Sequence, residues 1–185
     1  MHMTATHDNS YNNRSVIECS VEDERWDDVV YEQDFHHALH AIEQSLPTDH
    51  ALHMMGKPYE ISLTLCDDPF IQNINKEWRN KDKATNVLSF PQFDDLLEET
   101  EMIPDGVNVP IGDIFIAYET VRQESITQNK TFKDHTLHMF VHGFLHLLGY
   151  DHINNDEAEI MEALEITILG RINIANPYET MYTEL

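Results

Sequence analysis

Three histidines at a fixed spacing constrain this chain more than any other feature of its sequence. His142, His146 and His152 stand at positions i, i+4 and i+10, and Gly149 lies three positions after the second histidine. Because a helix turns by about 100° per residue, His142 and His146 lie one turn apart on the same face. Gly149 can take the left-handed conformation that ends a helix, so the chain can double back and bring His152 to the other two rings.

Three imidazoles from a helix and its following turn can form an open tetrahedral zinc site, with the fourth position left for water. The sequence therefore predicts one zinc ion per chain at an active centre, bound by His142, His146 and His152. Two alternatives are a hydrogen-bonded core cluster and a purely structural zinc. A structural zinc needs a fourth protein ligand, and the two cysteines, Cys19 and Cys66, are both distant in the sequence.

The residue after the first histidine separates this motif from that of the metalloproteases. Their helix reads H-E-x-x-H, where the glutamate is the general base. Gly143 occupies that position here, so water activation must rely on the metal or on a carboxylate from elsewhere. Asp151 is a candidate to accept the second N–H of a ligand imidazole, or else to cap the turn. His138 lies one turn before His142, where a packing or supporting role is favoured over substrate contact.

The composition is typical of one globular domain. The chain has 185 residues, of which 41% are hydrophobic and 24% charged, so it is long enough to bury a core. No uncharged apolar run reaches the length of about 18 residues that a membrane span needs. The first ten residues lack a signal core and the two cysteines form no C-x-x-C pair. We therefore expect a cytoplasmic protein without disulfides.

The charge of the chain is strongly acidic but unevenly distributed. The net charge of −23 argues against nonspecific binding to nucleic acid, which rests on Lys and Arg displacing counterions from phosphates. Four cations nevertheless fall within eight positions: Lys76, Arg79, Lys81 and Lys83. This cation group could admit a single strand at one place, while the acidic body repels polyanions elsewhere. The alternative is that they are ordinary solvated cations of a helix end and a loop.

Hydrophobic periodicity predicts an α+β fold with a small mixed sheet and about five helices. The strands are expected at 16–19, 59–66, 86–90 and 111–118. The helices are expected within 34–55 and over 68–78, 119–128, 131–148 and 155–170. No internal repeat interrupts this pattern.

Several local details of these elements can also be predicted. Asp68 is expected to cap the helix at 68–78, with Trp78 among its inward residues. Asn155 is expected to cap the last helix, with Ile160 on its buried face. The segment 92–110 carries six carboxylates and no cation, so a solvated, mobile loop is expected there.

These motifs resemble those of the YbeY family, the bacterial endoribonucleases of ribosomal RNA maturation. Residues 142–152 (HGFLHLLGYDH) are similar to the family's signature, and residues 78–91 (WRNKDKATNVLSFP) to its second one. Gly112-Asp113-Ile114 resembles a third, shorter motif, and the likeness spans roughly residues 15–178. Asn80 stands where the family often has glycine, and because Asn tolerates the left-handed region, the turn can survive. The acidic segment 92–110 is longer than usual for the family.

The resemblance implies a single compact α+β domain over residues 14–178 with a metalloprotease-like zinc helix. A disordered leader is expected over 1–13 and a tail over 179–185. By resemblance, the three histidines are the zinc ligands and Arg79 is the family's functional arginine. The implied substrates are single-stranded and ribosomal RNA, in 3′-end maturation of small-subunit ribosomal RNA and in ribosome quality control. A ribosomal partner is expected as well.

The resulting hypothesis is metal-assisted cleavage of a phosphodiester bond. Arg79 would bind the phosphate through both of its outer nitrogens and stabilise the charge that develops on it, and Lys76, Lys81 and Lys83 would guide the flanking backbone. One alternative is a metallopeptidase, against which the missing glutamate weighs. The other is a non-catalytic ribosome-assembly factor with a structural zinc, since an acidic protein could meet RNA chiefly through a protein partner.

Overall fold

A four-stranded mixed sheet forms the centre of the computed structural model, which describes residues 15–179. Its order is β1-β2-β4-β3. The strands β1, β2 and β4 run parallel, and β3 pairs antiparallel with β4 at one edge. The strands are β1 (Ser15–Val21), β2 (Tyr59–Cys66), β3 (Val87–Pro91) and β4 (Val109–Ala117). The predicted mixed sheet is confirmed.

Five long helices and two short ones accompany the sheet within residues 15–179. The long helices are α1 (Glu32–Ser45), α3 (Asp68–Arg79), α5 (Tyr118–Thr127), α6 (Phe132–Leu147) and α7 (Asn155–Arg171). The short ones are α2 (Ala51–Met54) and α4 (Leu96–Thr100). In this described part of the chain, none of the helices is both long and apolar enough to cross a membrane. The predicted α+β class and the five principal helices are confirmed.

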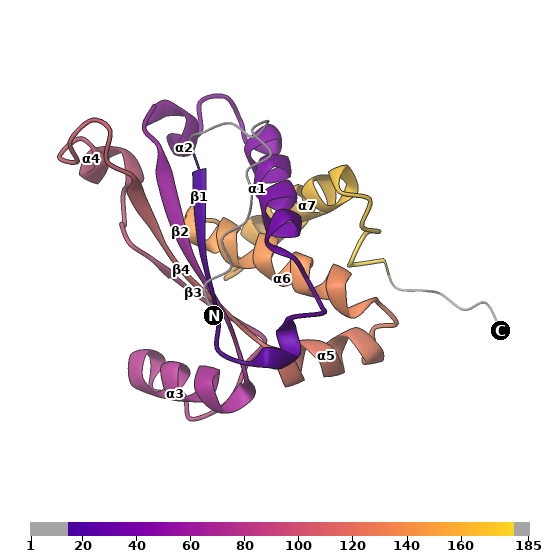
Figure 1. Ribbon diagram of the computed structural model, residues 1–185. Helices are drawn as coiled ribbons and strands as arrows, with labels where there is room; N and C mark the ends of the chain where they lie inside the picture. The colour runs from indigo at the N-terminus through magenta and orange to yellow at the C-terminus, as the bar shows by residue number, and fades with distance from the viewer. Residues whose placement is uncertain (1–14, 180–185) are drawn as a thin grey trace.

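The helices divide unequally between the two faces of the sheet. In Figure 1, α1, α6 and α7 gather on one side of the sheet, whereas α3 lies apart from them at its lower end. The helix α6 contacts β3 and β4 and is itself contacted by α1, α5 and α7. Because successive strand residues point to opposite faces, Ile114 is buried toward α6 while Phe115 packs against Phe70 of α3, with ring centroids 6.3 Å apart.

The helix α6 is the central element of the core. It begins after Thr131, whose hydroxyl accepts a hydrogen bond from the backbone N–H of Asp134 at 3.0 Å. Eleven of its sixteen residues are buried, including the fully covered rings of Phe140 and Phe144. A helix held on so many sides presents its remaining side chains in fixed positions, which matters because α6 carries two of the predicted metal ligands.

The N-caps of two helices lie one residue earlier than predicted. The N-cap of α3 is Asp67, whose carboxylate accepts from the backbone N–H of Phe70 at 2.8 Å. Asp68 begins the helix, and its carboxylate accepts from the backbone N–H and hydroxyl of Thr120 instead. The N-cap of α7 is Asn154 rather than Asn155. In each pair both residues can cap, so only the backbone geometry decides between them.

The acidic segment 92–110 is not entirely a loop. Asp95 caps the short helix α4, and Thr100 is buried. The ammonium of Lys57, which comes from outside this segment, donates to the carbonyl oxygens of Thr100 (2.9 Å) and Ile103 (2.5 Å). A cation from elsewhere in the chain therefore helps to anchor this acidic segment, which its local sequence could not predict.

Two apolar side chains expected to be buried are exposed. Trp78 in the last turn of α3 is 68% exposed, and Ile160 of α7 is 61% exposed. Both predictions of an inward side chain are wrong. Trp78 contacts the ring of Phe90 on the edge strand β3, at 6.2 Å between centroids, and its position in the last turn leaves the rest of the ring in solvent.

Candidate metal centre

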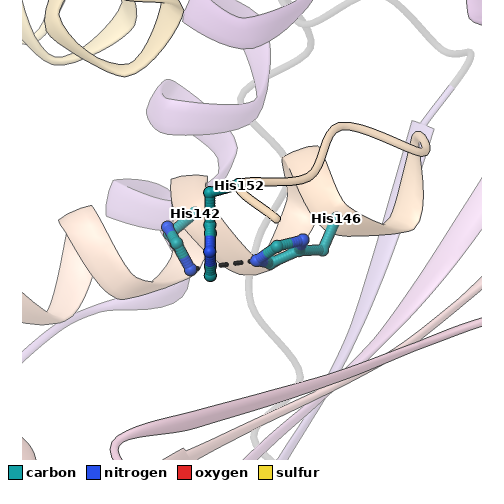
Figure 2. Close-up of side chains that lie close together, drawn as sticks. All are labelled: His142, His146 and His152. Atoms are coloured by element: carbon teal, nitrogen blue, oxygen red, sulfur yellow. Dashed lines mark hydrogen bonds between the residues drawn. The ribbon is translucent and has the colours of Figure 1, made fainter. Parts of the chain in front are cut away.

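The three predicted ligands meet at the C-terminal end of α6. In Figure 2 the rings of His142, His146 and His152 point toward one another, the first two from the helix and the third from the segment that follows it. One ligand atom of each residue lies within 4.8 Å of those of the other two. Among residues 15–179 the cluster offers three protein ligands, which is the number found in open zinc sites, whereas structural sites use four.

The turn that brings the third histidine back is a Schellman motif built on Gly149. This glycine has φ +87°, in the left-handed region. Its N–H donates to the carbonyl of His146 at 3.0 Å, and the N–H of Tyr150 donates to that of Leu145 at 3.1 Å. These two bonds satisfy carbonyls at the end of the helix and reverse the chain direction. The predicted role of Gly149 in ending the helix is confirmed.

Hydrogen bonds made by the Nδ1 atoms of His142 and His146 fix the tautomers of these two rings. The Nδ1 atom of His142 lies 2.7 Å from Oε1 of Glu165, and that of His146 lies 2.9 Å from the carbonyl oxygen of Tyr150. A carboxylate and a carbonyl can only accept hydrogen bonds, so both Nδ1 atoms carry the proton and donate. Both Nε2 atoms then present lone pairs toward the cluster.

When both rings are neutral, these two Nε2 lone pairs face each other at 3.0 Å, across the contact that Figure 2 marks with a dashed line. Lone pairs at that distance repel unless a cation is shared between them. Two ligands bonded to one tetrahedral zinc at about 2.0–2.1 Å would lie about 3.3 Å apart, close to the separation found. The donor set therefore fits a divalent metal ion. The end of α6 adds to this fit, since the C-terminus of a helix is the negative end of its dipole.

Glu165 is the supporting residue that sequence reasoning missed. It lies on α7, is fully buried, and accepts from His142 through one oxygen and from His138 through the other, the latter at 3.1 Å. Tyr178 also donates its hydroxyl proton to this second oxygen. The sequence does contain a pattern that indicates this role. Glu165 lies at helical spacing from Met161 and Ile168, so it is a charged residue on the buried face of the helix.

The environment of Glu165 keeps it ionised. Burial alone would raise the pKa of this carboxyl, but the hydrogen bonds from His138 and His142 outweigh burial and lower the pKa from 4.5 to about 2. Burial also lowers the pKa of His138, so this imidazole is neutral at pH 7. One buried negative charge thus lies against a metal ligand, in position to offset part of the charge of a bound cation.

The other candidates near the cluster have local structural roles. Asp151 accepts from the backbone N–H of His152 at 2.7 Å, so it caps the turn and does not orient a ligand ring. His138 supports the site through Glu165, in agreement with the expected supporting role. Its neighbour on the helix, His135, is paired with Glu124 at 2.8 Å.

Gly143 occupies the position of the metalloprotease glutamate for a steric reason. A Cβ atom on this residue would lie 2.9 Å from Oγ of Ser89, 3.1 Å from a methyl group of Ile114 and 3.2 Å from one of Val87. Any side chain here would meet the sheet, so α6 could not pack as closely on β3 and β4. The close packing of α6 on β3 and β4 thus explains why position 143 is a glycine.

The predicted cations lie on a different element from the histidines. Lys76 and Arg79 belong to the last turn of α3, and Lys81 and Lys83 are exposed in the segment that follows. Asn80 ends the helix with φ 55°, so the expected left-handed turn is confirmed. The structure brings the three histidines together, while a role for Arg79 and the lysines stays a prediction.

An α+β domain with three histidines converging from a helix and its following turn places the chain in the class of metal-site proteins. A family model described as Endoribonuclease YbeY matches residues 17–173. Endoribonuclease YbeY of Rhizobium leguminosarum bv. trifolii (strain WSM2304) is 56% identical over 123 residues, which are 66% of this chain and 68% of that protein. Endoribonuclease YbeY of Methylocella silvestris (strain DSM 15510 / CIP 108128 / LMG 27833 / NCIMB 13906 / BL2) is 42% identical over 166 residues, 90% and 87% of the two chains. The chain belongs to the YbeY endoribonuclease family, as its motifs predicted.

One solved structure is similar in fold. The solution structure of TM1509 from Thermotoga maritima has a TM-score of 0.51 and covers 91% of this chain and 99% of its own. The two sequences are 18% identical, so this likeness bears on the fold alone. It agrees with the predicted single α+β domain.

Proposed function

We propose that the protein is a zinc-dependent endoribonuclease that cleaves single-stranded RNA in the cytoplasm. Its proposed tasks are 3′-end maturation of small-subunit ribosomal RNA and ribosome quality control. The observation that supports this most is the pair of facing Nε2 atoms of His142 and His146, 3.0 Å apart beside the exposed His152, in a chain of an endoribonuclease family. The proposed catalytic domain is 14–178. The proposed leader (1–13) lies outside the described residues, as does the proposed tail (179–185) except for residue 179.

One zinc ion per chain would be held by His142, His146 and His152. When bound, it supplies a Lewis acid for a phosphoryl oxygen or lowers the pKa of a water toward about 7. Glu165 holds the ring of His142 in the ligating orientation, and the Tyr150 carbonyl does the same for His146. His152 is exposed, which leaves this side of the cluster open to a polymeric substrate.

Arg79 is proposed to bind the phosphate at the scissile bond. Its planar guanidinium can donate to two phosphate oxygens at once, which a lysine cannot do. The group is exposed, so it can reach a substrate without breaking an internal contact. Lys81 and Lys83 would guide the flanking backbone. Lys76 is paired with Asp82 at 2.7 Å, and because water and salt screen such an exposed pair, Lys76 can exchange Asp82 for a phosphate.

The acidic surface makes a protein partner part of the proposal. A net charge of −23 repels long polyanions from most of the surface. A ribosomal protein that holds the enzyme near its target would overcome this repulsion. The cation group at the end of α3 would then receive the single strand.

The direct test is cleavage of a short unstructured RNA by the purified, metal-loaded protein. Cleavage should occur, stop on addition of a chelator, and be absent in His146→Ala. A casein assay run beside it separates a peptidase from a nuclease. Hydrolysis of casein with no RNA turnover would overturn the proposal, and ribosome binding that survives His142→Ala without any turnover would favour a structural zinc. A single 2′-deoxy group at the scissile position then decides the nucleophile, because continued cleavage excludes the 2′-OH.

A further inference from the structure

Trp78 is an exposed aromatic ring in a setting that holds it in place. Its side chain is 68% exposed, which is unusual for the largest apolar side chain. One part of the ring lies on Phe90 of the edge strand, 6.2 Å between centroids and tilted by 56°. Phe90 in turn packs edge-on against Phe115 at 6.0 Å. Phe90, itself packed on Phe115, thus holds one side of the Trp78 ring and leaves the rest of the ring exposed to solvent.

The cations beside Trp78 are held there by a buried asparagine. The side-chain amide of Asn75 donates to the carbonyl of Lys83 at 2.7 Å, and its backbone carbonyl accepts from the N–H of Lys81 at 3.2 Å. These bonds fold the segment after α3 back against the helix end, where Trp78 and Arg79 lie.

This region is locally positive on an acidic molecule. Residues 76–83 contain four cations and two carboxylates, whereas the whole chain has a net charge of −23. Within residues 15–179, the charged ends of Arg79, Lys81 and Lys83 make no ion pair or hydrogen bond. Cations without carboxylate partners next to an exposed aromatic ring are the combination that binds single-stranded nucleic acid, through phosphates and through stacked bases respectively.

We propose that Trp78 is a stacking platform for one unpaired base of the RNA substrate, with Arg79, Lys81 and Lys83 holding the phosphates on either side. This inference rests on the proposed endoribonuclease function and adds a binding residue to it. Stacking has little dependence on the identity of the base, because every base has an aromatic face. The site therefore selects unpaired nucleotides over paired ones without reading sequence.

The position of the platform indicates which nucleotide it takes. Ser89 points toward α6, near Gly143, so its neighbour Phe90 and the ring of Trp78 lie on the other side of β3. The platform and the histidines are thus separated by the edge strand. Trp78 would stack on a base that flanks the scissile bond, while the phosphate backbone crosses the exposed edge of β3 toward the metal centre. Loss of the ring should then weaken binding and leave the chemical step nearly unchanged.

Intrinsic fluorescence reads this contact directly. The chain has two tryptophans, and Trp26 is only 1% exposed, so quenching by a stacked base reports on Trp78. We would add an octamer of 2′-O-methyluridine to the metal-loaded protein, and in parallel an abasic octamer with the same backbone. The uridine octamer should quench the emission and the abasic one should not. In Trp78→Phe the remaining emission should not respond to either. Equal quenching by both oligomers, or no quenching at all, would overturn the platform.

Cleavage kinetics of a short unstructured RNA give the second readout. Trp78→Ala should raise KM by about tenfold, the loss expected for one base–aromatic stack, with kcat within about twofold. Trp78→Phe should restore most of the affinity, because a phenyl ring can still stack. Ile126→Ala is the matched control, since Ile126 is a similarly exposed apolar residue on α5, at 62%. Unchanged KM in Trp78→Ala with normal cleavage would reject the platform and leave the nuclease standing, whereas no cleavage by the unaltered protein would reject the nuclease itself.

Discussion

The carboxylate of Glu165 binds the ring of His142 from the side opposite the metal cluster, with Oε1 2.7 Å from Nδ1. The two residues lie on different helices, α7 and α6, and are 23 positions apart in the chain. This bond sets the tautomer of His142 and points its Nε2 lone pair at His146. The packing of α7 on α6 is thereby part of the metal site, and it explains why a helix with no ligand of its own matters to the chemistry.

Glu165→Gln should weaken metal binding by about 10- to 100-fold, the usual effect of altering the partner of a ligand imidazole. The amide is nearly isosteric but lacks the charge, and an NH2 group in the place of Oε2 can accept from neither His138 nor Tyr178. Competition with a chromophoric chelator measures the affinity. Tyr178→Phe is the control, because it removes one donor to Glu165 and leaves the bond to His142 in place. Equal affinities of Glu165→Gln and the unaltered protein would show that the bond does not tune the site.

The metal-free protein should lose stability as the pH falls below about 6.5. Burial lowers the pKa of His138 from its usual 6.5, and burial together with the nearby His142 lowers that of His146. Because these pKa values are lower in the folded chain than in the unfolded one, folding favours the unprotonated rings. Their contribution is complete above the unfolded pKa and is lost as the pH drops through the interval below it.

Thermal unfolding near pH 7.5 and pH 5.5 checks this, with enough salt to screen the acidic surface. The Tm should be lower at the acidic pH. Bound zinc should be released over the same interval, since the ligands must be unprotonated. A Tm that stays constant or rises toward pH 5.5, or zinc that is retained at pH 4.5, would contradict three coordinating histidines in this environment.

Gly143→Ala should destabilise the fold by about 1–3 kcal/mol, the cost of overpacking a dense core. The added methyl group would press on Ser89, and on the stiff side chains of Val87 and Ile114. Denaturant unfolding measures the free energy. Gly170→Ala is the matched control, because Gly170 also lies within a helix, but no atom of residues 15–179 outside its own helix backbone and chain neighbours lies within 4 Å of the added methyl. That variant should gain about 0.5–1 kcal/mol from helix propensity, and a similar gain at Gly143 would show that α6 does not need the close approach.

Arg79→Ala should lower kcat/KM for RNA by about a hundredfold, or ~3 kcal/mol, as for the loss of one donor to the charge in a transition state. Arg79→Lys should recover only part of this, because an ammonium cannot bind two oxygens in the same plane. Steady-state cleavage of a short RNA gives both values. Arg122→Ala on α5 is the control, since Arg122 is also an exposed helical arginine. Near-normal cleavage by Arg79→Ala would remove Arg79 from the mechanism.

The sequence predicted the metal centre well because its geometry is local. The spacing of His142 and His146 on one turn, and a glycine that ends the helix, suffice to place three rings together without any long-range contact. The strands and the long helices were also predictable, since their buried faces follow simple periods. The caps at Asp67 and Asn154 were missed by one residue, because neighbouring residues of equal capping ability leave the choice to the backbone.

The features that the sequence did not predict depend on contacts between distant segments. Glu165 reaches His142 only because α7 packs on α6. Lys57 anchors the segment around α4 from more than forty positions away. Trp78 falls on the expected inner face of α3, yet the last turn of that helix offers it little beyond Phe90 to pack against. Periodicity gives the direction of a side chain, but what covers it depends on the tertiary structure.

The most direct test of a three-histidine catalytic metal site is a titration of the metal-stripped protein with zinc, in which bound metal and RNA cleavage are measured on the same samples. Cleavage should be absent without metal, rise in proportion to bound zinc and level off at one ion per chain, while His146→Ala should neither retain the ion nor cleave. Full cleavage by protein in which elemental analysis finds no metal would contradict a catalytic role for the cluster of His142, His146 and His152.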